Sequence, residues 1–101
     1  MNTAPITSAQ RATISMIVDT AIDVTLQGRY VADAEFHGGV HAVIVATHPV
    51  GDSQISEKGE LLICYMNPGH ERDGETRDER IETELAHLFC HLHGKLQEAQ
   101  S

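Results

Sequence analysis

The chain has 101 residues and a formal net charge of −8, with 15 acidic side chains against seven Lys and Arg. This length suits a single domain, residues 1–101, with one modest core. The acidic excess disfavours direct binding of nucleic acid through phosphate contacts, and no apolar run has the length of a membrane span.

The composition also bears on the compartment and the partners of the protein. Residues 1–5 lack the basic and apolar leader of a secreted protein, so we expect a cytoplasmic protein with its two cysteines, Cys64 and Cys90, reduced. An acidic surface suits solubility, and it also suits contact with a basic protein partner.

Residues 8–27 are predicted to form the first helix. Thr7 or Ser8 provides an N-terminal cap, and Gly28 provides the stop. The residues predicted to share one face are Ile14, Ile17, Val18, Ala21 and Thr25.

Residues 30–36 and 40–47 are predicted to form a hairpin. The first strand alternates and places Asp33 and Glu35 on its polar face. The turn is His-Gly-Gly at residues 37–39, because adjacent glycines accept the positive φ of tight hairpins. The second strand is more continuously apolar and is predicted to be central.

Residues 60–66 are predicted to form a third, buried strand, because four apolar residues follow one another at 61–64. Asn-Pro-Gly at residues 67–69 ends this strand. Residues 70–76 are strongly charged and are predicted to be a solvated connection.

Residues 77–98 are predicted to form the last helix. Thr76 and Glu79 have the form of a capping box at its start. The apolar stripe of this helix consists of Ile81, Leu85, Leu88, Leu92, Leu96 and Ala99.

Glu84, His87 and His91 fall on one side of this stripe, since spacings of three and four return to the same face. Two histidines four residues apart can reach one zinc ion, and Cys90 or His70 could complete the coordination sphere. The alternative is that these histidines are half-buried packing residues with solvated tips.

Residues 83–88, Thr-Glu-Leu-Ala-His-Leu, resemble the His-Glu-Leu-Ala-His-Leu core of zincin metallopeptidases, particularly the ImmA/IrrE and SprT-like groups. Those families place the motif on a helix that follows an antiparallel sheet, often after a strand ending in Asn-Pro. Residues 61–68 are similar to that strand.

The resemblance implies that Glu84 is the general base and His87 the one surviving zinc ligand. Thr83 stands where the family has its first histidine, and threonine is not an ordinary zinc ligand. With little room for a third ligand before Ser101, we expect a degenerate scaffold without peptidase activity.

The predicted fold is α+β in the order α-β-β-β-α, a small three-stranded antiparallel sheet packed by two helices. Such a small sheet leaves an edge uncovered, and a second copy could close it, so a homodimer is one expectation. No cofactor is expected, except zinc under the metal-binding alternative.

Three hypotheses for function follow. The first is a non-catalytic binding or regulatory protein that acts by protein–protein contact, with inhibition of a basic nucleic-acid-handling partner as its special case. The second is a zinc-binding protein or metallohydrolase using Glu84, His87 and His91, and the third is a structural or assembly subunit. The carboxylates that would serve charge mimicry are Asp73, Glu75, Asp78, Glu79 and Glu82.

Overall fold

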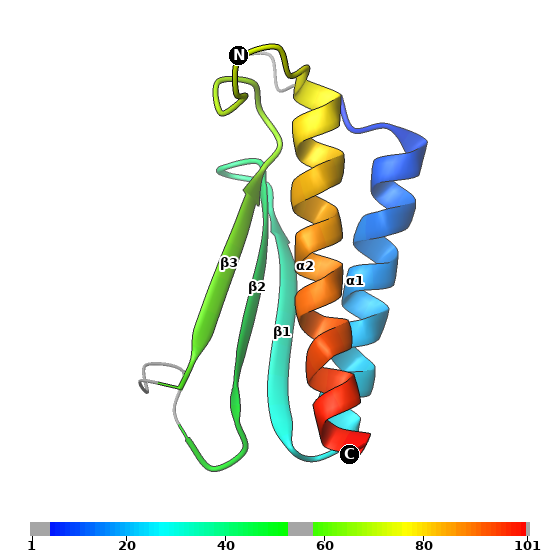
Figure 1. Cartoon of the computed structure of the whole chain (residues 1–101), viewed down its shortest axis with the longest axis vertical. Helices are drawn as coiled ribbons and strands as arrows, with labels where there is room; N and C mark the ends of the chain where they lie inside the picture. Colours follow the sequence, from blue (N-terminus) through cyan, green and yellow to red (C-terminus); the bar gives the residue numbers. More distant parts are fainter. Residues whose placement is uncertain (1–4, 53–57, 101) are drawn as a thin grey trace.

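Two helices cover one face of a three-stranded antiparallel sheet (Figure 1). The computed structural model describes residues 5–52 and 58–100. Its elements are α1 (Ser8–Leu26), β1 (Tyr30–His37), β2 (Ala42–Pro49), β3 (Glu60–Tyr65) and α2 (Arg77–Gln100). The α+β class and the order α-β-β-β-α are therefore confirmed, and β2 is the central strand.

The core lies between the sheet and the two helices. The predicted stripe of α2 is buried at Ile81, Leu85, Leu88 and Leu92, which are at most 2% exposed. Burying each such side chain stabilises the fold by about 1.5 to 3 kcal/mol. The residues that meet this stripe are Ile17, Ala21 and Val24 of α1, Val43 and Val45 of β2, and Cys64 and Met66 at the end of β3.

The helix ends are fixed by the predicted caps. Thr7 and Gln10 form a capping box at α1, and the side chains and backbone of Thr76 and Glu79 exchange hydrogen bonds of 2.9 and 3.1 Å at the start of α2. Gly28 follows α1 with a φ of 87°, which glycine adopts without steric cost.

The buried face of α1 differs from the prediction at three positions. Val18 is 39% exposed and Thr25 is also exposed, whereas Val24 is buried. The reason is that α1 packs against both β1 and α2, which turns Val18 and Thr25 toward the flank beside β1.

The hairpin turn also differs from the prediction. β2 begins at Ala42 rather than at residue 40, and the positive φ of 53° falls on His41 instead of on the glycines. The carbonyl of His41 accepts a 2.9 Å hydrogen bond from the N–H of Met66, so this turn is held against the end of β3.

The prediction that β3 is buried along its apolar run is wrong. Leu61 is 64% exposed and Ile63 is 38% exposed, while Cys64 is fully buried. Both helices lie on the same side of the sheet, so alternate residues of β3 face away from them. Neither helix, over the residues described, has the combination of length and hydropathy that crossing a lipid bilayer requires.

Candidate functional site

Three of the residues singled out from the sequence, His70, Glu84 and His87, line one small cavity beside α2. Its volume is about 60 Å³, and the side chains around it also include Arg72, Glu75, Arg80 and Thr83. Pockets for small organic ligands are typically about 300 to 1,000 Å³, so this space suits water rather than an organic substrate.

Glu84 is held inside this region by Arg80, which is only 2% exposed. Nη1 of Arg80 donates a 2.9 Å hydrogen bond to Oε1 of Glu84, and Nε donates one of 2.8 Å to Oε2 of Glu71. The same guanidinium donates to the carbonyls of Tyr65 and Asn67, at 2.6 and 2.9 Å. Glu84 is thus one side of an ion pair within the fold.

These contacts shift two titrations. Burial alone would lower the pKa of Arg80, but its ion pairs with Glu71 and Glu84 outweigh burial and raise that pKa. The N–H of Gly69 and the guanidinium of Arg80 lower the pKa of Glu71. The connection at residues 70–76 is therefore anchored at Glu71 rather than solvated throughout, as its charge pattern had indicated.

Sequence reasoning missed Arg80, although one signal was present. Arg80 stands directly before Ile81 of the apolar stripe and four residues before Glu84, a spacing that brings two helical side chains together. An arginine next to a buried apolar stripe can itself be buried when a carboxylate is close enough to pair with it.

His91 lies apart from this cavity and contacts the sheet. Its Nε2 shares a 2.9 Å hydrogen bond with Oγ1 of Thr47, and its Nδ1 is 3.9 Å from Oε2 of Glu60. Burial lowers the pKa of His91. Thr47, His91 and Glu60 have the order of a hydrolytic triad, but Thr47 is 2% exposed, so we assign the group to helix–sheet packing.

Glu60 also anchors the far end of α2. Nζ of Lys95 is 2.7 Å from Oε1 of Glu60, and this hydrogen bond lowers the pKa of the carboxyl. Together with the bond between Thr47 and His91, the pair ties α2 to the start of β3 and to the end of β2.

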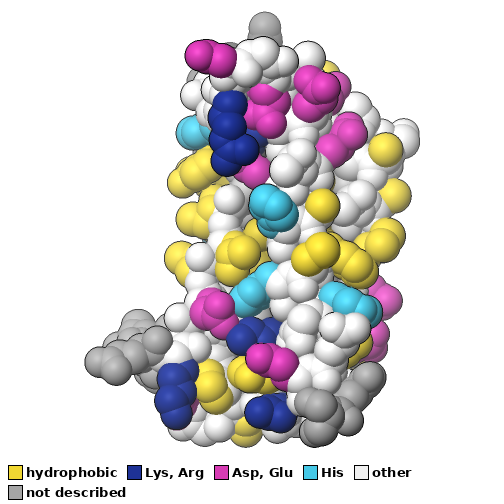
Figure 2. Space-filling model, in the orientation of Figure 1, with side chains coloured by type: hydrophobic (Ala, Val, Ile, Leu, Met, Phe, Trp, Pro, Cys, Tyr) yellow, Lys and Arg dark blue, Asp and Glu magenta, His cyan; other side chains and the backbone are white. Residues whose placement is uncertain are grey.

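The structure does not bring the predicted ligands to one point. Cys90 is exposed, His91 is bonded to Thr47, and only His70, Glu84 and His87 share a cavity. Histidine side chains are spread along the face shown in Figure 2. Within the described parts of the chain, no group of three His, Cys, Asp or Glu is placed to hold a metal ion.

A second candidate site is the outer face of the sheet, which we define as the side away from both helices. The ladder places its side chains in three rows: Asp33, Ala46 and Leu61; Glu35, Ile44 and Ile63; His37, Ala42 and Tyr65. The β1 side of this face is acidic, and the β3 side is apolar. Sequence reasoning missed it because it assigned the apolar run of β3 to the core.

No protein-family model matches the chain, and no curated protein or solved structure gives a significant match. The resemblance of residues 83–88 to the zincin core therefore stays a prediction that rests on the motif alone.

Proposed function

We propose that this protein is a small binding module that acts by contact with another protein, and that the outer face of the sheet is its contact surface. The observation that carries this proposal is the exposure of three apolar side chains on one strand. Leu61, Ile63 and Tyr65 are 64%, 38% and 40% exposed, and they project from the same side of β3. Contiguous exposed apolar surface on a small protein is typical of an interaction site.

The outer face also has the charge to select a partner. Asp33 and Glu35 lie in the same rows as Leu61 and Ile63, with Ala46 and Ile44 between them. A complementary protein would offer an apolar patch with basic side chains along one margin. Electrostatic complementarity of this kind raises the association rate and is weakened by salt.

The acidic stretch that precedes and begins α2 supports the contact less well. Several of its carboxylates are used within the fold, since Glu75 accepts from the N–H of Arg72 and Glu79 accepts from the N–H of Thr76. Asp78 accepts from the side chain of Gln10 and pairs with Arg77. Charge mimicry by this stretch is therefore the weaker form of the proposal.

Inhibition of a basic nucleic-acid-handling protein is a narrower version of the same hypothesis, in which this protein covers the functional surface of its partner.

The zinc or hydrolase alternative draws on His70, Glu84 and His87 alone, because His91 is engaged with Thr47. The geometry thus favours the binding hypothesis over the metal hypothesis.

The test is quantitative co-purification from the cells in which the protein occurs, comparing the wild type with Leu61→Asp. The matched control is Val40→Asp, because Val40 is 58% exposed but lies in the turn between β1 and β2. We expect a partner that is retained by the wild type and the control and lost with Leu61→Asp. Recovery of the same proteins by the wild type and both variants would show that the outer face is not the contact surface.

Charge is tested in the same experiment by Glu35→Lys and by salt. If the partner is basic, Glu35→Lys reduces its recovery and the wild-type complex weakens as salt is raised. A complex that is insensitive to both changes would support the binding module but exclude a basic partner.

A further inference from the structure

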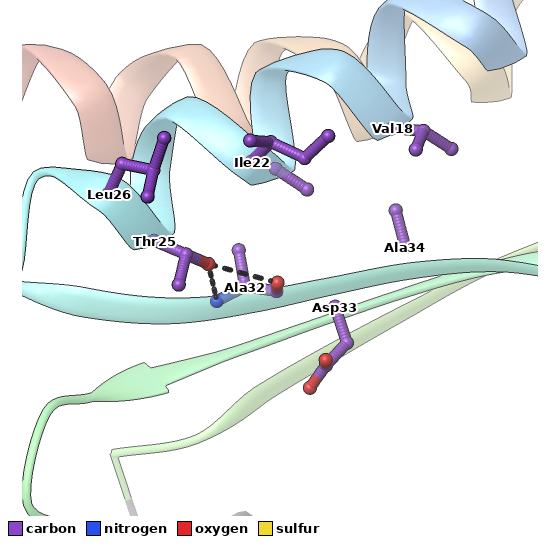
Figure 3. Close-up of a pocket in the computed structure, with 8 residues that line it drawn as sticks. Val18, Ile22, Thr25, Leu26, Ala32, Asp33 and Ala34 are labelled. Atoms are coloured by element: carbon purple, nitrogen blue, oxygen red, sulfur yellow. Dashed lines mark hydrogen bonds between the residues drawn. The ribbon is translucent and has the colours of Figure 1, made fainter.

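An apolar groove runs between α1 and β1, at the edge of the sheet farthest from β3 (Figure 3). Val18, Ile22 and Leu26 project along it at a spacing of four residues and are 39%, 51% and 78% exposed. This part of the groove has a volume of about 300 Å³.

The groove continues toward the start of α1. A second hollow of about 330 Å³ is lined by Ile6, Arg11, Ile14, Ser15 and Phe36. We call the whole surface the α1–β1 groove and define it by Val18, Ile22 and Leu26 of α1 with Ala34 and Phe36 of β1.

The backbone of β1 is open in the middle of this groove. Oγ1 of Thr25 bonds both backbone groups of Ala32, accepting from its N–H at 3.0 Å and donating to its carbonyl at 3.2 Å (Figure 3). Backbone groups point the same way at every second residue of a strand, so those of Ala34 and Phe36 face the same edge. No described residue supplies hydrogen bonds to them there, which leaves an unpaired strand edge beside an apolar helix stripe.

We infer that the α1–β1 groove binds a second copy of this chain, with β1 of one copy pairing antiparallel to β1 of the other. In this arrangement Ala34 of each copy exchanges backbone hydrogen bonds with Phe36 of the other, and the two sheets join into one of six strands. The same two-fold axis brings the two α1 stripes together. The backbone edge and the apolar stripe are self-complementary, which is the requirement of an isologous interface. This register also places the two Glu35 side chains opposite each other across the axis, a like-charge contact that the apolar burial must outweigh.

The charges on α1 support the antiparallel arrangement. The helix carries one basic residue, Arg11, in its first half and two acidic residues, Asp19 and Asp23, in its second half. Antiparallel packing of two such helices opposes the basic end of each to the acidic end of the other. A parallel arrangement would oppose like charges, which costs association free energy.

The size of the groove is consistent with a dimer of modest affinity. The 19 residues of α1 span about 28 Å at 1.5 Å each. With a helix diameter of about 11 Å and a strand spacing of about 5 Å, each copy offers roughly 450 Å² in projection. Two copies would therefore bury about 900 Å² in total, which is below the about 1,200 Å² of standard stable interfaces and in the range of weak, transient ones.

Sedimentation equilibrium tests this inference with Ile22→Asp and a matched control, Met16→Asp. Met16 is 50% exposed, as Ile22 is at 51%, and it lies on α1 away from the groove. We expect twice the chain mass for the wild type and for Met16→Asp. Ile22→Asp should raise the dimer dissociation constant about 100-fold, because it would bury a carboxylate without a partner. A monomeric wild type, a dimer unaffected by Ile22→Asp, or loss in both variants would each overturn the proposal.

Two further measurements separate this interface from any other dimer. Arg11→Glu should weaken the dimer, and the added change Asp23→Arg should restore it. Hydrogen exchange at the amides of Ala34 and Phe36 should slow as wild-type concentration rises, and stay fast in Ile22→Asp. A wild-type dimer whose Ala34 and Phe36 amides remain unprotected would exclude strand pairing.

Discussion

Nε of Arg80 and Oε2 of Glu71 lie 2.8 Å apart, and this contact fixes the connection between β3 and α2. The side chain of Arg80 is 3% exposed, and it also bonds Glu84 and two backbone carbonyls. Glu71 thus holds the charged connection between β3 and α2 against the packed part of the protein.

Replacement of Arg80 by Met should destabilise the protein by about 2 to 3 kcal/mol, because two carboxylates and two carbonyls lose their donor. This loss is smaller than the about 3 to 5 kcal/mol of a fully buried pair, because the side chain of Glu84 is 36% exposed and regains water. Urea denaturation measures the change. Arg72→Met, at an exposed position of the same connection, is the control and should stay within about 0.5 kcal/mol of the wild type.

The bond between His91 and Thr47 predicts a loss of stability in mild acid. Burial lowers the pKa of His91 below its ordinary value of about 6.5, so the unfolded chain binds this proton more readily than the folded one. The contribution of His91 to the free energy of unfolding is complete above about pH 6.5. It is lost as the pH falls from there toward the lower pKa of His91 in the folded protein. Glu60, Lys95 and Glu98 act on the same ring, with the two carboxylates opposing the shift and Lys95 adding to it.

Urea denaturation of the wild type and of His91→Gln at pH 7, 6 and 5 measures this effect. The wild type should lose more stability across the series, because glutamine retains a hydrogen-bonding group but does not titrate. Equal losses in the two proteins would show that the ring is not held as a neutral base.

Metal removal should leave the protein unchanged. His91 is turned toward Thr47 and Glu84 toward Arg80, so His70 and His87 lack the further ligands of a tetrahedral zinc site. We expect less than stoichiometric zinc in protein purified without added metal, and the same Tm with and without EDTA. One zinc per chain that disappears in His87→Ala would instead establish the metal-binding alternative.

The two thiols should differ sharply in reactivity. Cys64 is fully buried, and burial raises its pKa to about 12, whereas Cys90 is exposed. Because the thiolate is the reactive form, Ellman's reagent should modify one thiol per native chain and the second only after unfolding. Cys90→Ser should abolish the fast reaction, and a fast thiol remaining in that variant would contradict the burial of Cys64.

Local pattern predicted the order of the elements, their approximate bounds and the buried face of α2, because these depend on neighbours in sequence. The stripe of α2 follows from helical periodicity, and its cap follows from Thr76 and Glu79. The central place of β2 followed from its continuous apolar character.

Most of the contacts that organise the sites were not predictable in this way, because they join residues far apart in the chain. The pair of Arg80 and Glu84, at a spacing of four residues, is the exception. An apolar run at 61–64 fits a strand buried on both faces, and only the placement of both helices on one side exposes Leu61 and Ile63. Likewise, spacing placed Glu84, His87 and His91 on one helix face, but Thr47 and Arg80 draw His91 and Glu84 to different neighbours.

The position of α2 in the chain has a consequence for how the protein folds. The buried face of α1 meets α2, although fifty residues separate the two helices, and Arg77 at the start of α2 donates a 2.7 Å hydrogen bond to the carbonyl of Pro5. During synthesis, α1 and the hairpin leave the ribosome before α2. Their apolar faces stay exposed to water until α2 is available to cover them. Completing the core therefore depends on contacts of high sequence separation, which slows folding.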